Sequence, residues 1–400
     1  MPDREFAGFR VDAVAGAVRQ PPLDELRVVA RSRRRRSTAL KGTALALLAM
    51  VIVVPLVTRP GPLRSAEPPT PSPGHTLPGR PGDFTLTGPE SGVDVRIDGC
   101  VLRFAHTTDG GRTWSDWNAS RYQVTRCRLD ADGVAGNFDY AVLGQRTYLV
   151  DDGGLLHLST DYGRTWQEAN RAIIGVPAFP ATARLVLCEF GCRAVEEPLA
   201  VDPASGQVYR LTGTPPSFLQ LFSVYPAADG SIWTTYDTAG AAAGGRSTDR
   251  GATWLSWTLP PGSTVLALAA VDGRRAYRLV AAADATVTLE STTDGGRTWS
   301  ERVEGFGKGL DWDLTIGADG SLLVVTQTGP QDNRRQEVRV SRDGGRSWEV
   351  VRDGGMPVGS VSVAPGYAWL FGGSDGPQGE ADHLMITRDG RTWSQFFLDS

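Results

Sequence analysis

The chain has 400 residues, of which 22% are charged and 40% hydrophobic, and its formal net charge is −4. The charge is divided unevenly: residues 1–64 hold 12 basic and 5 acidic residues, whereas residues 65–400 hold 29 and 40. This acidic balance argues against nucleic acid as a partner of the larger part, because phosphate contacts depend on Lys and Arg.

The N-terminal part predicts a membrane anchor. Residues 38–58 form an apolar run of 21 residues, and about 20 suffice to span a bilayer as a helix. Five arginines stand just before it, at position 31 and at positions 33–36. By the positive-inside rule, residues 1–37 form a cytoplasmic tail without stable structure, and the rest of the chain lies outside.

Two other interpretations of this part stay open. A cleaved signal peptide would need a shorter leader and a small-x-small cleavage site, and Leu63-Arg-Ser-Ala66 is a poor one. The arginines could also bind nucleic acid or anionic lipid. After the apolar run, residues 59–82 are rich in proline and predict an extended linker.

A short motif, Ser/Thr-x-Asp-x-Gly-x-Thr/Ser-Trp, then recurs six times, the last copy being one residue shorter. Its Asp and Trp pairs are Asp109 and Trp114, Asp161 and Trp166, Asp249 and Trp254, Asp294 and Trp299, Asp343 and Trp348, and Asp389 and Trp393. The aspartates are 52, 88, 45, 49 and 46 residues apart, so the gap of 88 predicts a seventh, decayed unit near Ser205. A period of about 40–50 residues indicates a β-propeller.

Each unit contains four short apolar segments separated by turn residues. In the sixth unit we expect strands at 312–317, 321–328 and 337–341, and a fourth from Trp348. The predicted fold is all-β: a seven-bladed β-propeller of four-stranded antiparallel blades over residues 83–400, preceded by one transmembrane helix.

The motif itself predicts a structural turn. Its Asp accepts hydrogen bonds from nearby backbone N–H groups, its Gly supplies an unusual backbone angle, and its Trp packs over the hairpin. Six acids spread around a ring cannot converge on one substrate. The copy at Asp389 lacks one residue, so its turn should be tighter or distorted.

On these six motifs the chain resembles the Asp-box (BNR-repeat) propellers of the sialidase-like superfamily. That family includes sialidases, endoglucanases and proteins that only bind. The resemblance implies that the motif lies on the turn between the third and fourth strands of a blade, away from the substrate face.

The four cysteines all fall in the part predicted to be exported, where an even number favours disulfides. Cys188 and Cys192 would link a hairpin in the decayed unit. Cys100 and Cys127 would then pair and tie the first unit to the entry of the second. Zinc binding is the alternative, but no clustered histidines accompany the cysteines.

The function predicted from the sequence is a membrane-anchored cell-surface protein that binds or scaffolds a protein or a glycan, without cofactor or metal. The alternative is an exo-sialidase-like glycoside hydrolase, although the family's Arg-Ile-Pro motif is not matched by Arg96-Ile-Asp98 and no catalytic residues are assigned. We expect a ligand at the long loops opposite the motif. Their candidate contacts are Lys308, Trp312, Asp332, Arg334 and Arg335.

Overall fold

The computed structural model describes residues 80–398, with gaps at 126, 130–134, 137, 170–171, 188–196, 214–215, 218, 239–240, 305–311, 329–334, 355–362 and 374–380. All of these belong to the second of two compact units, Pro60–Ser400. The predicted tail, anchor and most of the linker lie outside the described residues. Within those residues, no helix is long and apolar enough to span a membrane.

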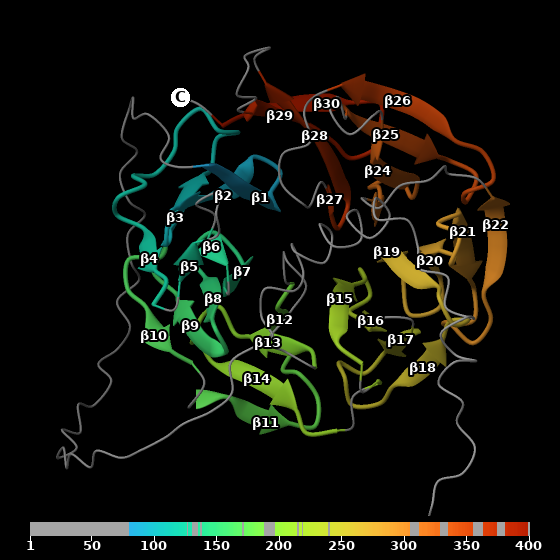
Figure 1. Cartoon of the computed structure of the whole chain (residues 1–400), viewed down its shortest axis with the longest axis horizontal. Coiled ribbons are helices and arrows are strands. Elements are labelled where there is room, and N and C mark those ends of the chain that lie inside the picture. The colour runs from blue at the N-terminus through green and yellow to red at the C-terminus, as the bar shows by residue number, and fades with distance from the viewer. Residues whose placement is uncertain are drawn as a thin grey trace, which may run out of the picture. The chain divides into compact units, whose positions relative to one another are not determined.

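Seven four-stranded sheets are arranged in a ring (Figure 1), so the predicted seven-bladed propeller is confirmed. Blades one and two are β1 (Arg80–Gly88), β2 (Ser91–Asp98), β3 (Val101–Thr107) and β4 (Arg121–Gln123), then β7 (Phe138–Val142), β8 (Tyr148–Asp152), β9 (Leu155–Ser159) and β10 (Gln167–Glu168). A two-stranded ribbon of β5 (Arg128–Leu129) and β6 (Ala135–Gly136) stands between them in the sequence.

Blade three contains β11 (Ile174–Val176), β12 (Arg184–Leu185), β13 (Leu199–Val201) and β14 (Val208–Leu211). Blades four and five are β15 (Leu221–Pro226), β16 (Ile232–Thr238), β17 (Ala241–Ser247) and β18 (Leu255–Thr258), then β19 (Thr264–Ala270), β20 (Ala276–Ala281), β21 (Val287–Thr292) and β22 (Ser300–Glu304). Blades six and seven are β23 (Trp312–Ile316), β24 (Leu322–Thr328), β25 (Arg335–Ser341) and β26 (Glu349–Gly354), then β27 (Val363–Ala364), β28 (Tyr367–Gly373), β29 (Ala381–Thr387) and β30 (Trp393–Phe397).

The strands form where the turn chemistry predicts them. In blade six, β23 and β24 are joined by the turn at Asp319 and Gly320. Gly320 has a φ of +81°, and the Asp319 carboxylate accepts the Ser321 N–H at 3.0 Å. An Asp-Gly turn of this kind needs a positive φ and a local acceptor, which is why it could be recognised in the sequence.

Blade three departs from the regular pattern. Its strand order is β11-β14-β13-β12, and β11 pairs with β14 in parallel, whereas the other neighbouring strands in the seven blades are antiparallel. The edge strand β11, next to β14, is therefore the first of the four strands in the sequence, whereas the strands of the other blades are neighbours in sequence order. The predicted hairpin near Ser205 is present as β13 and β14. Its turn is closed by Asp202, which accepts the N–H groups of Ala204 at 2.9 Å and Ser205 at 3.3 Å.

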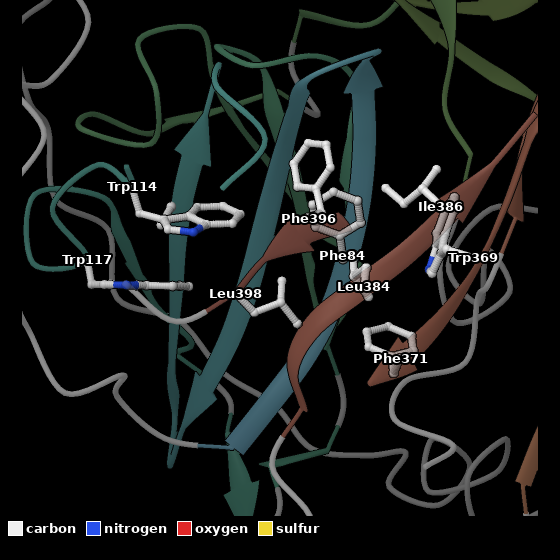
Figure 2. Packing of buried hydrophobic residues seen from close by; sticks show 10 residues of the cluster. Phe84, Trp114, Trp117, Trp369, Phe371, Leu384, Ile386, Phe396 and Leu398 are labelled. Carbon is white, nitrogen blue, oxygen red and sulfur yellow. The ribbon is translucent and has the colours of Figure 1, made fainter. Parts of the chain in front are cut away.

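The ring closes without a shared strand, because β1 belongs to blade one and β30 to blade seven. These two blades are held together by a cluster of buried apolar side chains. Figure 2 shows aromatic rings from both blades in this cluster. Phe84 of blade one meets Trp369 edge-on at 5.9 Å and Phe396 at 5.2 Å, measured between ring centroids. Burying large aromatic rings is the main source of stabilisation available here.

One disulfide is described, between Cys100 and Cys127. Cys100 lies in the turn between β2 and β3, and Cys127 follows β4, so the bond fastens the outer strand of blade one at the entry to blade two. This is the pairing that the sequence predicts. The predicted partners Cys188 and Cys192 lie outside the described residues.

Candidate functional site

The six aspartate motifs build one repeated turn between the third and fourth strands of a blade. In the five full-length copies, Oδ1 of the Asp accepts a hydroxyl two residues before it at 2.8 Å and a backbone N–H four residues after it at 2.9–3.0 Å. Oδ2 accepts the hydroxyl of that later residue at 2.6–2.7 Å. Both oxygens of each carboxylate are therefore occupied within the turn.

These hydrogen bonds keep the motif acids ionised. Side-chain and backbone hydrogen bonds from Thr298 hold the pKa of Asp294 well below its usual range, and Ser347 does the same for Asp343. A catalytic acid would need a raised pKa and a proton to donate. The motif carboxylates are instead permanent acceptors, as the structural interpretation of the motif predicts.

The shortened motif at Asp389 is distorted as the sequence predicts. The Thr392 hydroxyl lies 3.4 Å from Oδ2 of Asp389, and the Thr387 hydroxyl lies 3.4 Å from Oδ1. The two side-chain bonds are therefore long. Oδ1 accepts the backbone N–H groups of Arg391 and Thr392, both at 2.8 Å.

Motif tryptophans also connect neighbouring blades. The indole N–H of Trp166 in blade two donates to the main-chain oxygen of Arg121 in β4 of blade one at 2.9 Å. That of Trp114 in blade one donates to Phe397 in β30 of blade seven at 3.0 Å. Trp254 and Trp348 donate within their own turns, to Gly251 and Gly345.

The loops predicted to bind a ligand are only partly described. Lys308, Asp332 and Arg334 lie outside the described residues, and Arg335 is the first residue of β25. Trp312, at the start of β23, is 7% exposed and packs among buried residues of blades five and six. Its indole is therefore packed in the core, and its contact with a ligand stays a prediction.

A pocket that the sequence did not predict is lined in part by blade three, the blade without the motif. It has a volume of about 330 Å³, and its walls come from blades two, three and four. The apolar walls include Val142, Leu143, Phe179, Leu185, Ala200 and Ile232. Arg184 and Arg250 also line it. The turn after β7, the turn after β15 and the motif of blade four all border the pocket, which places it on the face that carries the motifs.

Both pocket arginines are held by main-chain oxygens. Arg184 donates through Nη1 to Leu143 at 3.0 Å. Arg250 donates through Nε to Phe179 at 2.7 Å and through Nη2 to Pro180. The backbone N–H of Phe179 returns a bond to the oxygen of Arg250 at 2.9 Å. The motif turn of blade four is therefore hydrogen-bonded to the segment that leads into β12.

A signal for this site was present in the sequence. The residue after the motif Asp is glycine in four copies, but it is Tyr162 in blade two and Arg250 in blade four. Both adopt a positive φ, +67° and +60°. Such angles are uncommon for residues other than glycine, so a large side chain kept there indicates a task for that side chain.

The likeness of the chain to known proteins is distant. No protein-family model matches the sequence, and no curated protein matches it significantly. Among solved structures, the chain is similar to a catalytically inactive virginiamycin B lyase from Staphylococcus aureus with quinupristin, at 12% identity and a TM-score of 0.42, covering 80% of this chain and 95% of that one.

Two further solved structures are similar to the chain at the same low level. The Hadza microbial sialidase Hz136 has 16% identity and a TM-score of 0.37, covering 80% of this chain and 65% of that one. YCF48 bound to D1 peptide has 17% identity and a TM-score of 0.33, covering 79% and 81%. Likeness at this level assigns no activity, and the chain is a propeller protein on the evidence of its own seven sheets.

Proposed function

We propose that the protein is a membrane-anchored cell-surface protein of the Asp-box type, which binds or scaffolds an extracellular protein or glycan and does not act on nucleic acid. The observation that carries the proposal is the commitment of the motif carboxylates to their own turns. In addition, no group of three or more His, Cys, Asp or Glu side chains among the described residues could hold a metal ion.

The direction of the strands shows at which face β1 starts. The turn after β1 lies at the motif face, because the Gly110 N–H donates to the oxygen of Glu90 in that turn at 2.9 Å. β1 therefore begins at the opposite face of the propeller.

The full-length protein tests the proposal in two assays. Residues 1–37 and the propeller should lie on opposite sides of the membrane, as shown by protease protection of tags at the two ends. The purified chain should not hydrolyse a fluorogenic sialoside, and a cross-linked extracellular partner should be recovered with it. Sialoside hydrolysis that exceeds a mock preparation would favour the glycoside hydrolase and overturn the binding-only function.

A further inference from the structure

We propose that the pocket in blade three binds an apolar side chain of a partner polypeptide whose neighbouring residue carries a carboxylate. The proposal rests on the binding function above and assigns it to a site. Its starting point is the place of the pocket in the fold. Blade three has no aspartate motif, and residues of its strands β12 and β13 line the pocket together with residues of blades two and four.

Blade three is closely packed between its neighbours. A Cβ on Gly206, in the turn after β13, would lie 3.0 Å from Cγ2 of Thr160 in the motif of blade two. A Cβ on Gly251, in the motif of blade four, would lie 2.6 Å from Cδ1 of Leu211 at the end of β14. Blade three therefore packs tightly against the motifs on both sides.

The walls select an apolar group. Ala200 is fully buried, and Ile232 and Phe179 are 4% and 3% exposed, so the floor presents carbon atoms held by the core. Leu187 at the edge is 37% exposed and extends the apolar surface outward. A volume of about 330 Å³ is at the low end for small-molecule sites and accepts one large side chain. The binding function proposed above favours a polypeptide over a lipid as the source of this group.

The rim selects a negative charge. Two arginines and no acidic residue line the pocket. Nη2 of Arg184 and Nη1 of Arg250 have no partner among the described residues, while the other side of each guanidinium is fixed by main-chain oxygens. A fixed guanidinium loses little freedom when it binds, and its planar N–H pairs match a carboxylate.

Acids close to the pocket residues in the chain are already engaged: both oxygens of Asp249, which precedes Arg250, accept hydrogen bonds within the motif turn. Asp202 accepts the Thr182 hydroxyl at 2.7 Å, and Asp229 accepts the Ser231 hydroxyl at 2.7 Å and the Gly273 N–H at 2.8 Å. Neither is available to neutralise the pocket arginines at short range. An apolar side chain next to Asp or Glu satisfies both the walls and the rim.

The test uses the full-length protein and two capped, fluorescein-labelled peptides, Gly-Gly-Leu-Asp-Gly-Gly and the same peptide with Asn for Asp. Fluorescence anisotropy should show about tenfold tighter binding of the Asp peptide, the size expected of a hydrogen-bonded charge pair. Arg184→Gln should lower the affinity for the Asp peptide to that for the Asn peptide. Arg391→Gln is the matched control, since Arg391 is also exposed and on the motif face but belongs to blade seven, and it should change neither affinity.

Two variants test the apolar part. Ala183→Trp should fill the pocket and lower the affinity for both peptides at least tenfold. Leu187→Glu, at an exposed position, should weaken only the Asp peptide by like-charge repulsion. An unchanged thermal midpoint in each variant shows that the fold is intact. If Ala183→Trp unfolds, the affinities of Leu187→Glu decide whether the peptide binds at this pocket.

The proposal is overturned if the wild-type chain binds neither peptide, if it binds the two equally, or if the pocket variants bind like wild type. It is also overturned if decanoate binds with the same dependence on Arg184 while the peptides do not, because the occupant would then be a lipid. A partner cross-linked equally to the wild-type and Ala183→Trp chains would leave the binding function standing and remove this site. Sialoside hydrolysis would remove the binding-only function and leave the peptide result unaffected.

Discussion

The indole N–H of Trp114 donates a hydrogen bond to the main-chain oxygen of Phe397, 3.0 Å away and 283 residues further along the chain. The Phe397 N–H in turn donates to the oxygen of Gly110 at 3.1 Å. A Cβ on Gly111 would lie 1.9 Å from the Phe397 oxygen, so only glycine permits this approach. The motif of blade one thus holds the last strand where no strand is shared between the two blades.

Replacing Trp114 tests this closure. Trp114→Phe removes the donor and part of a buried ring, and should lower the free energy of unfolding by about 1–3 kcal/mol. Hydrogen exchange of residues 393–398 should become faster, because β30 loses an attachment to blade one. Trp254→Phe is the matched control, since the Trp254 indole donates only within its own turn. Equal acceleration at residues 393–398 in both variants would show that Trp114 has no special part in closure.

The hydroxyl near the end of the motif should stabilise the fold more in the full-length motifs than in the shortened one. The Thr165 hydroxyl lies 2.7 Å from Asp161, whereas the Thr392 hydroxyl lies 3.4 Å from Asp389. Thr165→Val should therefore lower the free energy of unfolding by about 1 kcal/mol, and Thr392→Val should leave it nearly unchanged. Denaturant titration of both variants beside wild type measures the difference, and a larger loss at Thr392 would contradict the geometry.

Stability should fall in mild acid because of His106. Burial, assisted by the charge of Arg164, lowers the pKa of the His106 imidazole to about 4. The unfolded chain has a pKa near 6.5 at this position and so binds the proton more readily than the folded chain. The stabilisation is complete above about pH 6.5 and is lost as the pH falls to about 4, by roughly 3 kcal/mol.

His106→Phe isolates this contribution. The ring of His106 stacks with that of Tyr162 at 4.6 Å between centroids, and Phe retains a ring there. The variant should lose less stability than wild type between pH 6.5 and 4, as measured by urea unfolding at each pH. The motif aspartates, whose folded-state pKa values are lowered, also lose stabilisation from about pH 5 downward, but this loss is common to both proteins and cancels in the comparison. Parallel pH profiles for the two proteins would show that His106 is not responsible.

Reduction should destabilise the protein through Cys100 and Cys127. Their bond spans 27 residues, and replacing both with Ser should lower the free energy of unfolding by about 2–4 kcal/mol. Calorimetry of the variant against wild type, each with and without reductant, measures this loss. A non-reducing peptide map should also contain a link between Cys188 and Cys192, and its absence would remove that second prediction.

The blade count and the local turns were determined by the sequence. The motif places an acceptor, a glycine and an indole within eight residues, so each turn is built from neighbours in the chain and is visible as a pattern. In the blade without the motif, the turn at Asp202 is also built from neighbours in the chain, because Asp202 accepts the N–H groups of Ala204 and Ser205. The pairing of Cys100 with Cys127 was predicted as the pair that remains once Cys188 is assigned to Cys192.

The pocket was decided only by the tertiary structure. Its walls come from three blades, and residues from Val142 to Arg250 meet in it. The burial of Trp312 was hidden from the sequence for a related reason: whether an aromatic side chain at a strand end is exposed depends on the neighbouring blade that packs on it. Local sequence encodes a turn through short-range hydrogen bonds, whereas a cavity is the space left by distant segments, and the one local trace of it was the arginine in place of glycine at position 250.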